Sequence, residues 1–225
     1  MKKIMFSDKF GLTEAVLSGR KTQTRRIINP QPEVSERMGM VWKGYAYGIT
    51  SPCGSPCFLK DVYHNFLSGT NYPQDRRYKV GEIVAIAQKY SDVAHGGCPV
   101  DSRYDAFRTA NWGDGEDGVL KSSAGWNNKL FVRADLMPHY IRITNVRVER
   151  LQDISDEDCI KEGVIESVVM GTNGSLSEYF VEGPKHICYG KTPREAYAVL
   201  IDLISGKGTW LSNPYVFVYD FELVD

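Results

Sequence analysis

Two long stretches without a regular apolar pattern, at about residues 30–78 and 91–128, limit where this chain can form regular structure. The first is punctuated by proline and glycine, and the second is rich in glycine and polar residues. Stretches of this length are too long to be ordinary connections in a compact domain. We therefore interpret the chain as a single domain, residues 1–225, that carries two insertions. The first insertion leaves room for a short strand from Tyr45 to Ile49.

The composition predicts a hydrophobic core and no bulk affinity for nucleic acid. Of 225 residues, 42% are hydrophobic and 12% aromatic, and the formal net charge is −1. A nucleic-acid site on such a chain needs a local basic patch. No apolar run approaches the roughly 20 residues that cross a bilayer, so no membrane association is expected. The first residues lack the apolar stretch of a signal peptide, and five scattered cysteines favour reduced thiols in the cytoplasm.

Several residues in the two insertions match zinc ligands by type, namely Cys53, Cys57, His64, His95 and Cys98. Their spacing fits no standard zinc finger, and there is no second close cysteine pair. The sequence therefore predicts neither a metal nor another cofactor.

The regular elements of the first half are short. Residues 7–18 have the pattern of a helix, with Ser7 or Asp8 as its cap and Gly19 as its stop. A turn at Val80-Gly81-Glu82 leads into a strand from Ile83 to Ala87. Both faces of that strand are apolar, which indicates a buried position in a sheet or barrel.

The second half has sharper signals. A strand from Ile141 to Val148 changes its alternation at Thr144-Asn145, which predicts a β-bulge. Two helices follow, one from a Ser155 cap to Gly163 and one from a Thr192 cap to Gly206. The closing strand alternates, with one apolar face: Phe217, Tyr219, Phe221 and Leu223. These elements predict an α+β fold, a small mixed β-barrel with short helices on its outside.

The basic segment from Gly19 to Arg26 has a composition that a packed core does not require. It holds four cations, two hydroxyls and one amide in eight residues. Such a cluster suits an anionic or strongly polar ligand, and a lysine beside a hydroxyl can also form a nucleophile-activating pair. We predict ligand contacts from Arg20, Thr22, Arg25 and Arg26.

Four ordered blocks of this sequence resemble those of ASCH-domain proteins. They are Gly19-Arg20-Lys21-Thr22-x-Thr24-x-Arg26, the Val80-Gly81-Glu82 turn, the stretch from Ile143 through Ile154-Ser155 to Glu162-Gly163, and Asn213-Pro214-Tyr215-Val216-Phe217-Val218 with Phe221-Glu222. The chain looks most similar to the long, phage- and prophage-associated branch. The matches run in order from about Phe6 to Leu223, with an unmatched middle.

The resemblance implies a PUA-like β-barrel, a fold associated with recognition of RNA or modified bases. A short bacterial branch of the family consists of amidohydrolases that deacetylate N4-acetylcytidine. Their catalytic lysine, threonine and glutamate match Lys21, Thr24 and Glu162. By this likeness Thr24 is the nucleophile or positions a water, Lys21 is the general base, and Glu162 orients the lysine or protonates the leaving amine.

Geometry sets a condition on this assignment. In a regular strand Lys21 and Thr24 would point to opposite faces. Both reach one ligand only if residues 21–24 include a turn, a bulge or the end of the helix.

Two departures from the family pattern concern ligand contacts. Relatives of the long branch usually carry Arg-Glu where this chain has Ala87-Gln88, and Met-Pro-Arg-Trp where it has Met137-Pro138-His139-Tyr140. We expect His139 to keep a hydrogen-bond donor, and Trp126 and Tyr140 to line the ligand cleft.

Three functions are consistent with the sequence. The first is binding of RNA, a nucleotide or a modified nucleoside in a basic cleft around residues 20–26. The second is a metal-independent amidohydrolase that deacylates N4-acetylcytidine-like nucleosides. The third is a phage-linked module that binds a protein partner through the insertions.

Overall fold

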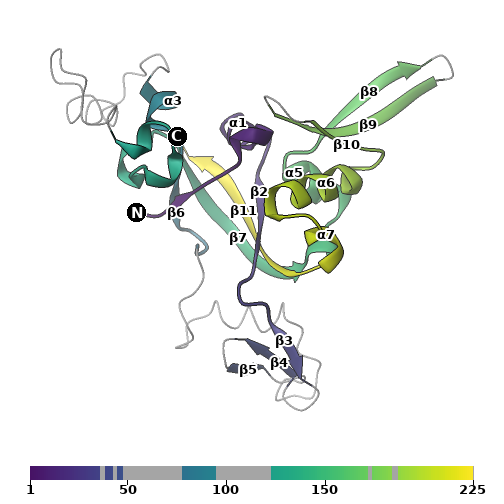
Figure 1. Cartoon of the computed structure of the whole chain (residues 1–225), viewed down its shortest axis with the longest axis horizontal. Helices are drawn as coiled ribbons and strands as arrows, with labels where there is room; N and C mark the ends of the chain where they lie inside the picture. Colours follow the sequence, from purple (N-terminus) through teal and green to yellow (C-terminus); the bar gives the residue numbers. More distant parts are fainter. Residues whose placement is uncertain are drawn as a thin grey trace.

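The computed structural model describes residues 1–35, 39–42, 45–47, 78–94, 123–171, 174–183 and 187–224 (Figure 1). Within these ranges the fold is α+β. The strands are β1 (Lys3–Ile4), β2 (Gln23–Ile27), β3 (Glu33–Ser35), β4 (Gly39–Trp42), β5 (Tyr45–Tyr47), β6 (Ile83–Ile86), β7 (Tyr140–Arg150), β8 (Ile165–Gly171), β9 (Gly174–Glu182), β10 (Ile187–Gly190) and β11 (Tyr215–Val224). The α-helices are α1 (Leu12–Leu17), α3 (Tyr90–Ala94), α5 (Asp156–Lys161), α6 (Pro193–Ser205) and α7 (Thr209–Ser212). The 3₁₀ helices are η1 (Asp8–Phe10), η2 (Ala124–Trp126), η3 (Lys129–Phe131), η4 (Ala134–Leu136) and η5 (Leu151–Asp153).

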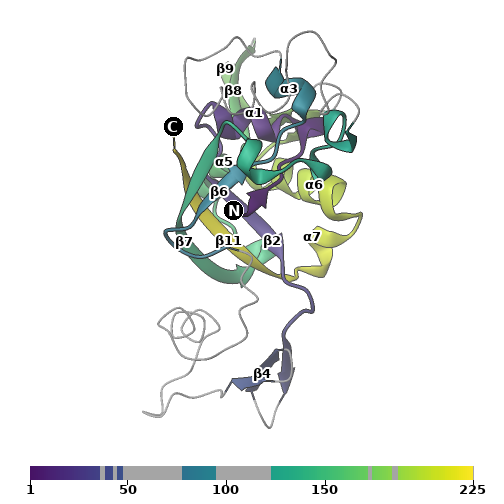
Figure 2. The same ribbon diagram turned by 90° about the vertical axis from the view of Figure 1, so that its left-hand side faces the viewer.

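The main sheet has five strands in the order β1-β6-β7-β11-β2. β1 runs parallel to β6, and the other neighbours are antiparallel. The long strands β7 and β11 curve along the sheet, and α6 and α7 lie beside it (Figure 2). In the strand order of the described residues, β1 and β2 form the two edges, so their hydrogen bonds do not close the sheet into a barrel.

The bulge predicted in the long strand is confirmed. Asn145 pairs with Asp220, whereas Ile143 pairs with Phe221. Thr144 is therefore the extra residue of β7, and it accounts for the shift in the apolar alternation.

The helix expected over residues 7–18 is wrong as one element. Gly11 adopts a left-handed conformation with φ of 62° and separates the 3₁₀ turn η1 from α1. A Cβ at Gly11 would lie 2.4 Å from the carbonyl oxygen of Glu182, so the backbones approach too closely for a side chain. The predicted end is correct, since Gly19 follows α1 with φ of 72°.

The two later helices begin and end as predicted. The Ser155 hydroxyl accepts a hydrogen bond from the Asp158 amide, and α5 is followed by Gly163 with φ of 109°. The Thr192 hydroxyl caps the Glu195 amide, with Pro193 at the first position of α6.

The closing strand is buried on both faces over much of its length, although one apolar face was expected. Val216 and Val218 are buried together with Phe217, Tyr219 and Phe221. β11 is central in the sheet, between β7 and β2, and side chains from both of its faces pack into the buried apolar cluster that joins the sheet to α1, α5 and α6. The strand predicted from Ile83 is likewise central, and its residues from Val84 to Ala87 are buried.

The buried apolar residues form two clusters. The larger joins the sheet to α1, α5 and α6. The smaller lies between β6 and the 3₁₀ turns η2 to η4, and contains Ala85, Ala87, Tyr90, Val93, Val132, Met137 and Tyr140.

Two further sheets each have three strands. One has the order β10-β9-β8 and contacts α6 through β10 and β9. The other, β3-β4-β5, lies within residues 30–78, so this insertion is not all loop, and β5 overlaps the strand predicted from Tyr45. No helix in the described ranges has the length and apolar character that crossing a bilayer requires.

Candidate functional site

The basic segment enters the sheet from the end of α1. The Lys21 amide donates to the carbonyl of Ala15 over 2.7 Å, and the Thr22 amide donates to the carbonyl of Lys161 over 3.0 Å. These bonds hold residues 20–22, which connect α1 to β2, against α1 and the end of α5. Lys21 thus precedes β2 while Thr24 lies inside it, which meets the geometric condition for both side chains to reach one ligand.

Glu162 comes to the same place from the C-terminal end of α5. Its Oε2 lies 2.5 Å from Lys21 Nζ, and its main-chain oxygen accepts from the same ammonium over 2.7 Å. Only 2% of Lys21 and 4% of Glu162 is exposed. Two charges so deeply buried are costly unless they pair, and this pair satisfies that condition.

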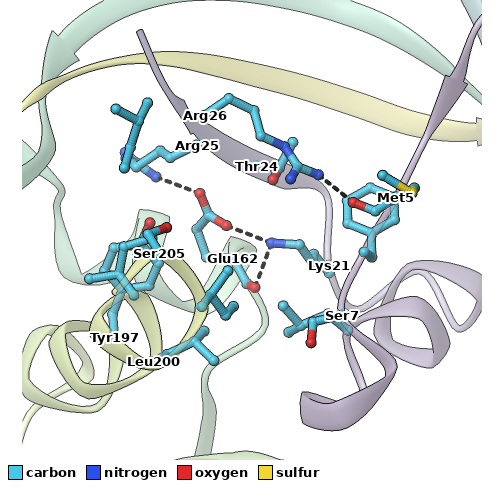
Figure 3. Close-up of a pocket in the computed structure, with 15 residues that line it drawn as sticks. Met5, Ser7, Lys21, Thr24, Arg25, Arg26, Glu162, Tyr197, Leu200 and Ser205 are labelled. Atoms are coloured by element: carbon cyan, nitrogen blue, oxygen red, sulfur yellow. Dashed lines mark hydrogen bonds and ion pairs between the residues drawn. The ribbon is translucent and has the colours of Figure 1, made fainter. Parts of the chain in front are cut away.

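Lys21, Thr24 and Glu162 line one cavity of about 140 Å³ (Figure 3). Met5, Phe6, Ser7 and Leu12 form one wall, and residues of α6 form another: Tyr197, Leu200, Ile201, Ile204 and Ser205. Ile204 and Ser205 are exposed and therefore lie at the mouth. A cavity of this size holds about one benzene-sized ring.

Thr24 is buried, and its side chain points toward Lys21 and Glu162 (Figure 3). No hydrogen bond within the described part of the chain engages its hydroxyl. The hydroxyl is therefore available to a molecule in the cavity.

Burial is the main influence on the protonation of Lys21. It lowers the pKa of the ammonium, and the positive charges of Arg26 and Arg25 lower it further, against the opposing effect of Glu162. The net pKa of Lys21 is below the ordinary value of 10.5. A lysine shifted in this direction is more readily neutral, as a general base must be.

Arg25 was expected to contact a ligand, but its guanidinium is bonded within the protein. Nε and Nη2 donate to Glu149, Nη2 also to Asp158, and Nη1 to Gln23 and Glu162. A guanidinium has five N–H groups in a fixed fork, and these five bonds account for them. Arg25 lines the cavity as a support of Glu162 and has no donor left for a ligand.

The other residues of the basic segment differ in position. Arg26 lines the cavity, donates to the Met5 carbonyl over 2.6 Å, and lies 5.8 Å from the Phe6 ring centre. Arg20 is exposed and donates to the carbonyl of Gly163 over 3.4 Å. Neither Arg20 nor Thr22 lines the cavity.

Trp126, His139 and Tyr140 do not line this cavity, in contrast to the expectation from the sequence. Tyr140 belongs to the smaller core cluster, and Trp126 packs against it. The Ile86 amide donates to the main-chain carbonyl of His139, so His139 is held beside β6. The order of strands in the sheet causes the separation, because β7 begins next to β6 and reaches α5 only at its far end.

Sequence reasoning did not identify the apolar walls as part of the site. Tyr197, Leu200, Ile201 and Ile204 recur at helical spacing, which indicates packing but does not tell a core face from a cavity wall. Burial, and then the nearby charge of Glu162, raises the pKa of Tyr197 well above its ordinary value, so its hydroxyl stays protonated.

The zinc-like residues of the insertions lie outside the described residues. Within the described ranges, no group of three or more His, Cys, Asp or Glu side chains is arranged to hold a metal ion.

Comparisons of this chain with protein-family models, with curated proteins and with solved structures found no match. The chemistry of the site therefore follows from its own residues.

Proposed function

We propose that this protein is an amidohydrolase that removes an acyl group from an N4-acetylcytidine-like nucleoside without a metal ion. The observation that carries the proposal is the buried Lys21–Glu162 ion pair on the same cavity as the unengaged Thr24 hydroxyl. These three side chains are the ones that the resemblance to ASCH-domain amidohydrolases selects.

The reaction begins with neutral Lys21. Its Nζ takes the proton of the Thr24 hydroxyl as Oγ1 attacks the carbonyl carbon of the substrate amide. A tetrahedral intermediate forms, with its negative charge on the former carbonyl oxygen. Arg26 is a cation on the cavity wall that stabilises this oxyanion.

Breakdown of the intermediate completes the transfer. The C–N bond breaks as the Lys21–Glu162 pair delivers a proton to the leaving exocyclic amine, which gives cytidine and an acyl-threonine. Water then attacks the ester with Lys21 as base, and acetate leaves while Thr24 regains its proton. An alternative with the same residues has Thr24 orient a water that attacks the amide directly.

The fold is part of the proposal. We assign the curved layer of β2, β11 and β7, with α5 packed at its end, to an ASCH-type, PUA-like barrel. Among the described residues, the two edge strands of this barrel are not joined by backbone hydrogen bonds. Support comes from the order of the matching blocks, since β2, β7, α5 and β11 carry them in the sequence. In space β11 pairs with both β2 and β7, and residues of β2 line the cavity together with Glu162 at the end of α5.

The site favours a nucleoside over an RNA strand. The cavity has room for about one ring, so the sugar would lie at the mouth beside Ile204 and Ser205. The charge of Arg25 is balanced by Glu149, Asp158 and Glu162. Lys21 is likewise paired with Glu162, so two of the four cations of the basic segment are neutralised within the protein and do not attract a phosphate backbone.

Binding without turnover is the second candidate. It is favoured by the resting contacts of Lys21, whose ammonium is held by two oxygens of Glu162 and must lose a proton before it can act as a base. The third candidate, a phage-linked protein-interaction module, depends on insertions that lie largely outside the described residues. We place the protein in the cytoplasm, in agreement with free thiols at Cys159 and Cys188.

The test is incubation of the purified protein with N4-acetylcytidine, with release of cytidine followed by chromatography. We expect turnover by the natural protein and its loss in Lys21→Met, while Lys161→Met, at an exposed neighbouring lysine, keeps it. Equal turnover by Lys21→Met, or no turnover by the natural protein, would refute the proposed hydrolase activity. In the latter case, calorimetric binding of cytidine or N4-acetylcytidine that Lys21→Met weakens supports the second candidate.

A further inference from the structure

Arg25 lies at the centre of a buried network that joins three elements. Its side chain from β2 contacts Glu149 of β7 over 2.5 Å, Asp158 of α5 over 3.0 Å and Glu162 over 3.3 Å. None of this guanidinium is exposed. Lys21 shares Glu162 with Arg25, and Arg147 shares Glu149 and Asp158, so these carboxylates link several cations.

The contact with Glu162 divides the two oxygens of that carboxylate. Oε1 faces Arg25 Nη1, and Oε2 faces Lys21 Nζ (Figure 3). A carboxylate held at one oxygen cannot rotate freely, so the oxygen that meets Lys21 stays in place. Nη1 also donates to Gln23, which fixes the guanidinium from its own strand.

Arg25 also acts on Lys21 through its charge. The groups that face Lys21 are Glu162 from the end of α5 and Arg25 and Arg26 from β2, with the Phe6 ring centre 5.9 Å away. Tyr197 of α6 faces Glu162. Arg25 is thus one of two cations that oppose protonation of the lysine, and it is the one without a donor left for a ligand.

We propose that Arg25 is a positioning residue of this site: it holds the Glu162 carboxylate against Lys21 Nζ and places a positive charge beside that lysine. The inference rests on the proposed function, because it assumes that Lys21 and Glu162 act in catalysis. Its test does not depend on catalysis. A purely structural arginine would contribute to folding and leave Lys21 unaffected.

Arg147 provides a matched control. It is bonded to Glu149, Asp158 and Asp220, which places it in the same network, but not to Glu162. Its replacement disturbs the network to a similar degree without touching the Lys21–Glu162 pair.

The experiment is an NMR titration of the lysine side chains, ¹³C-labelled at Cε, with the Lys21 signal assigned by its absence in Lys21→Met. Arg25→Gln and Arg25→Met should raise the titration midpoint of Lys21 by about one pH unit or more, as expected for loss of a nearby like charge. Arg25→Lys, which keeps a charge, and Arg147→Met should each stay within about 0.3 units of the natural protein, below the shift expected for a charge in direct contact.

Two results overturn the proposal: an unchanged Lys21 midpoint in Arg25→Gln, or an equal shift in Arg147→Met. If Arg25→Met does not fold, the comparison of Arg25→Gln with Arg25→Lys still decides. The titration uses no substrate, so failure to hydrolyse N4-acetylcytidine would refute the proposed function and leave this result standing.

Discussion

Lys21 and Glu162 are 141 positions apart in the chain, and their side chains meet in a buried ion pair with 2.5 Å between Nζ and Oε2. The pair lies where the end of α1 meets the end of α5, on a cavity that also receives Thr24. Five measurements test this geometry and the packing around it.

The hydroxyl of Thr24 should matter for turnover and little for folding. Thr24→Val keeps the shape and removes the hydroxyl, so we expect turnover of N4-acetylcytidine to fall by about 100-fold or more, as for loss of a nucleophile or of a group that orients it. Thr24→Ser keeps a hydroxyl and should retain a measurable part of the turnover. Because the hydroxyl has no hydrogen-bond partner in the described chain, urea unfolding of Thr24→Val should differ by less than about 1 kcal/mol. A variant that unfolds readily would show a structural role instead.

The ion pair should contribute little net stability. Lys21→Met strands the Glu162 carboxylate with a single, longer contact to Arg25, and we expect it to cost about 3 kcal/mol. Lys21→Met with Glu162→Met removes both charges and should recover most of that loss. Chemical denaturation of the two variants measures the difference. A double variant less stable than the single one would mean that the pair itself stabilises the fold.

Stability and turnover should both rise with pH on account of Lys21. In the unfolded chain its pKa returns to about 10.5, so between the lowered folded value and 10.5 the unfolded state binds more protons. The free energy of unfolding therefore increases with pH across that window, and the neutral base becomes more abundant. Urea unfolding of the natural protein and of Lys21→Met at a series of pH values isolates the effect, as the difference between their free energies of unfolding. A difference that falls with rising pH would contradict a lowered pKa of Lys21 in the folded protein.

Gly163 should be needed for the site as well as for the end of α5. It has φ of 109°, and a Cβ there would lie 3.3 Å from Leu12. Gly163→Ala should cost about 1–2 kcal/mol through backbone strain and displace the Glu162 carbonyl that holds Lys21. Gly206→Ala is the control, since its φ is 110° and a Cβ there would meet no atom of the described residues within 4 Å apart from its chain neighbours. We expect both variants to melt at lower temperature than the natural protein and only Gly163→Ala to lose turnover. Equal activities of the two variants would show that Gly163 does not support the geometry of the site.

The mouth of the cavity should control access. Ile204 is 41% exposed and lines the cavity, whereas its neighbour Leu203 is 53% exposed and does not. Ile204→Trp should narrow the entrance and raise KM about tenfold, equivalent to about 1.4 kcal/mol of lost binding. Leu203→Trp should leave KM unchanged. Steady-state kinetics on N4-acetylcytidine, or binding of cytidine if there is no turnover, checks this; equal effects would place the ligand elsewhere.

Local signals in the sequence predicted much of the fold. The Ser155 and Thr192 caps, the glycine stops and the bulge at Thr144 depend on neighbouring residues, and the structure confirms them. The break at Gly11 could not be predicted, because its cause is the approach of Glu182, far along the chain. The two buried faces of β11 likewise depend on which distant elements pack against them.

The site residues could be predicted from the sequence, because the composition of residues 19–26 pointed to Lys21 and Thr24 and the resemblance to ASCH-domain proteins added Glu162. Their surroundings could be read only from the folded chain. It placed Arg25 among three carboxylates, removed Trp126, His139 and Tyr140 from the cavity, and made the apolar side of α6 its wall. Burial, ion pairing and cavity walls arise from contacts between segments distant in the chain, and local spacing in the sequence does not encode these contacts.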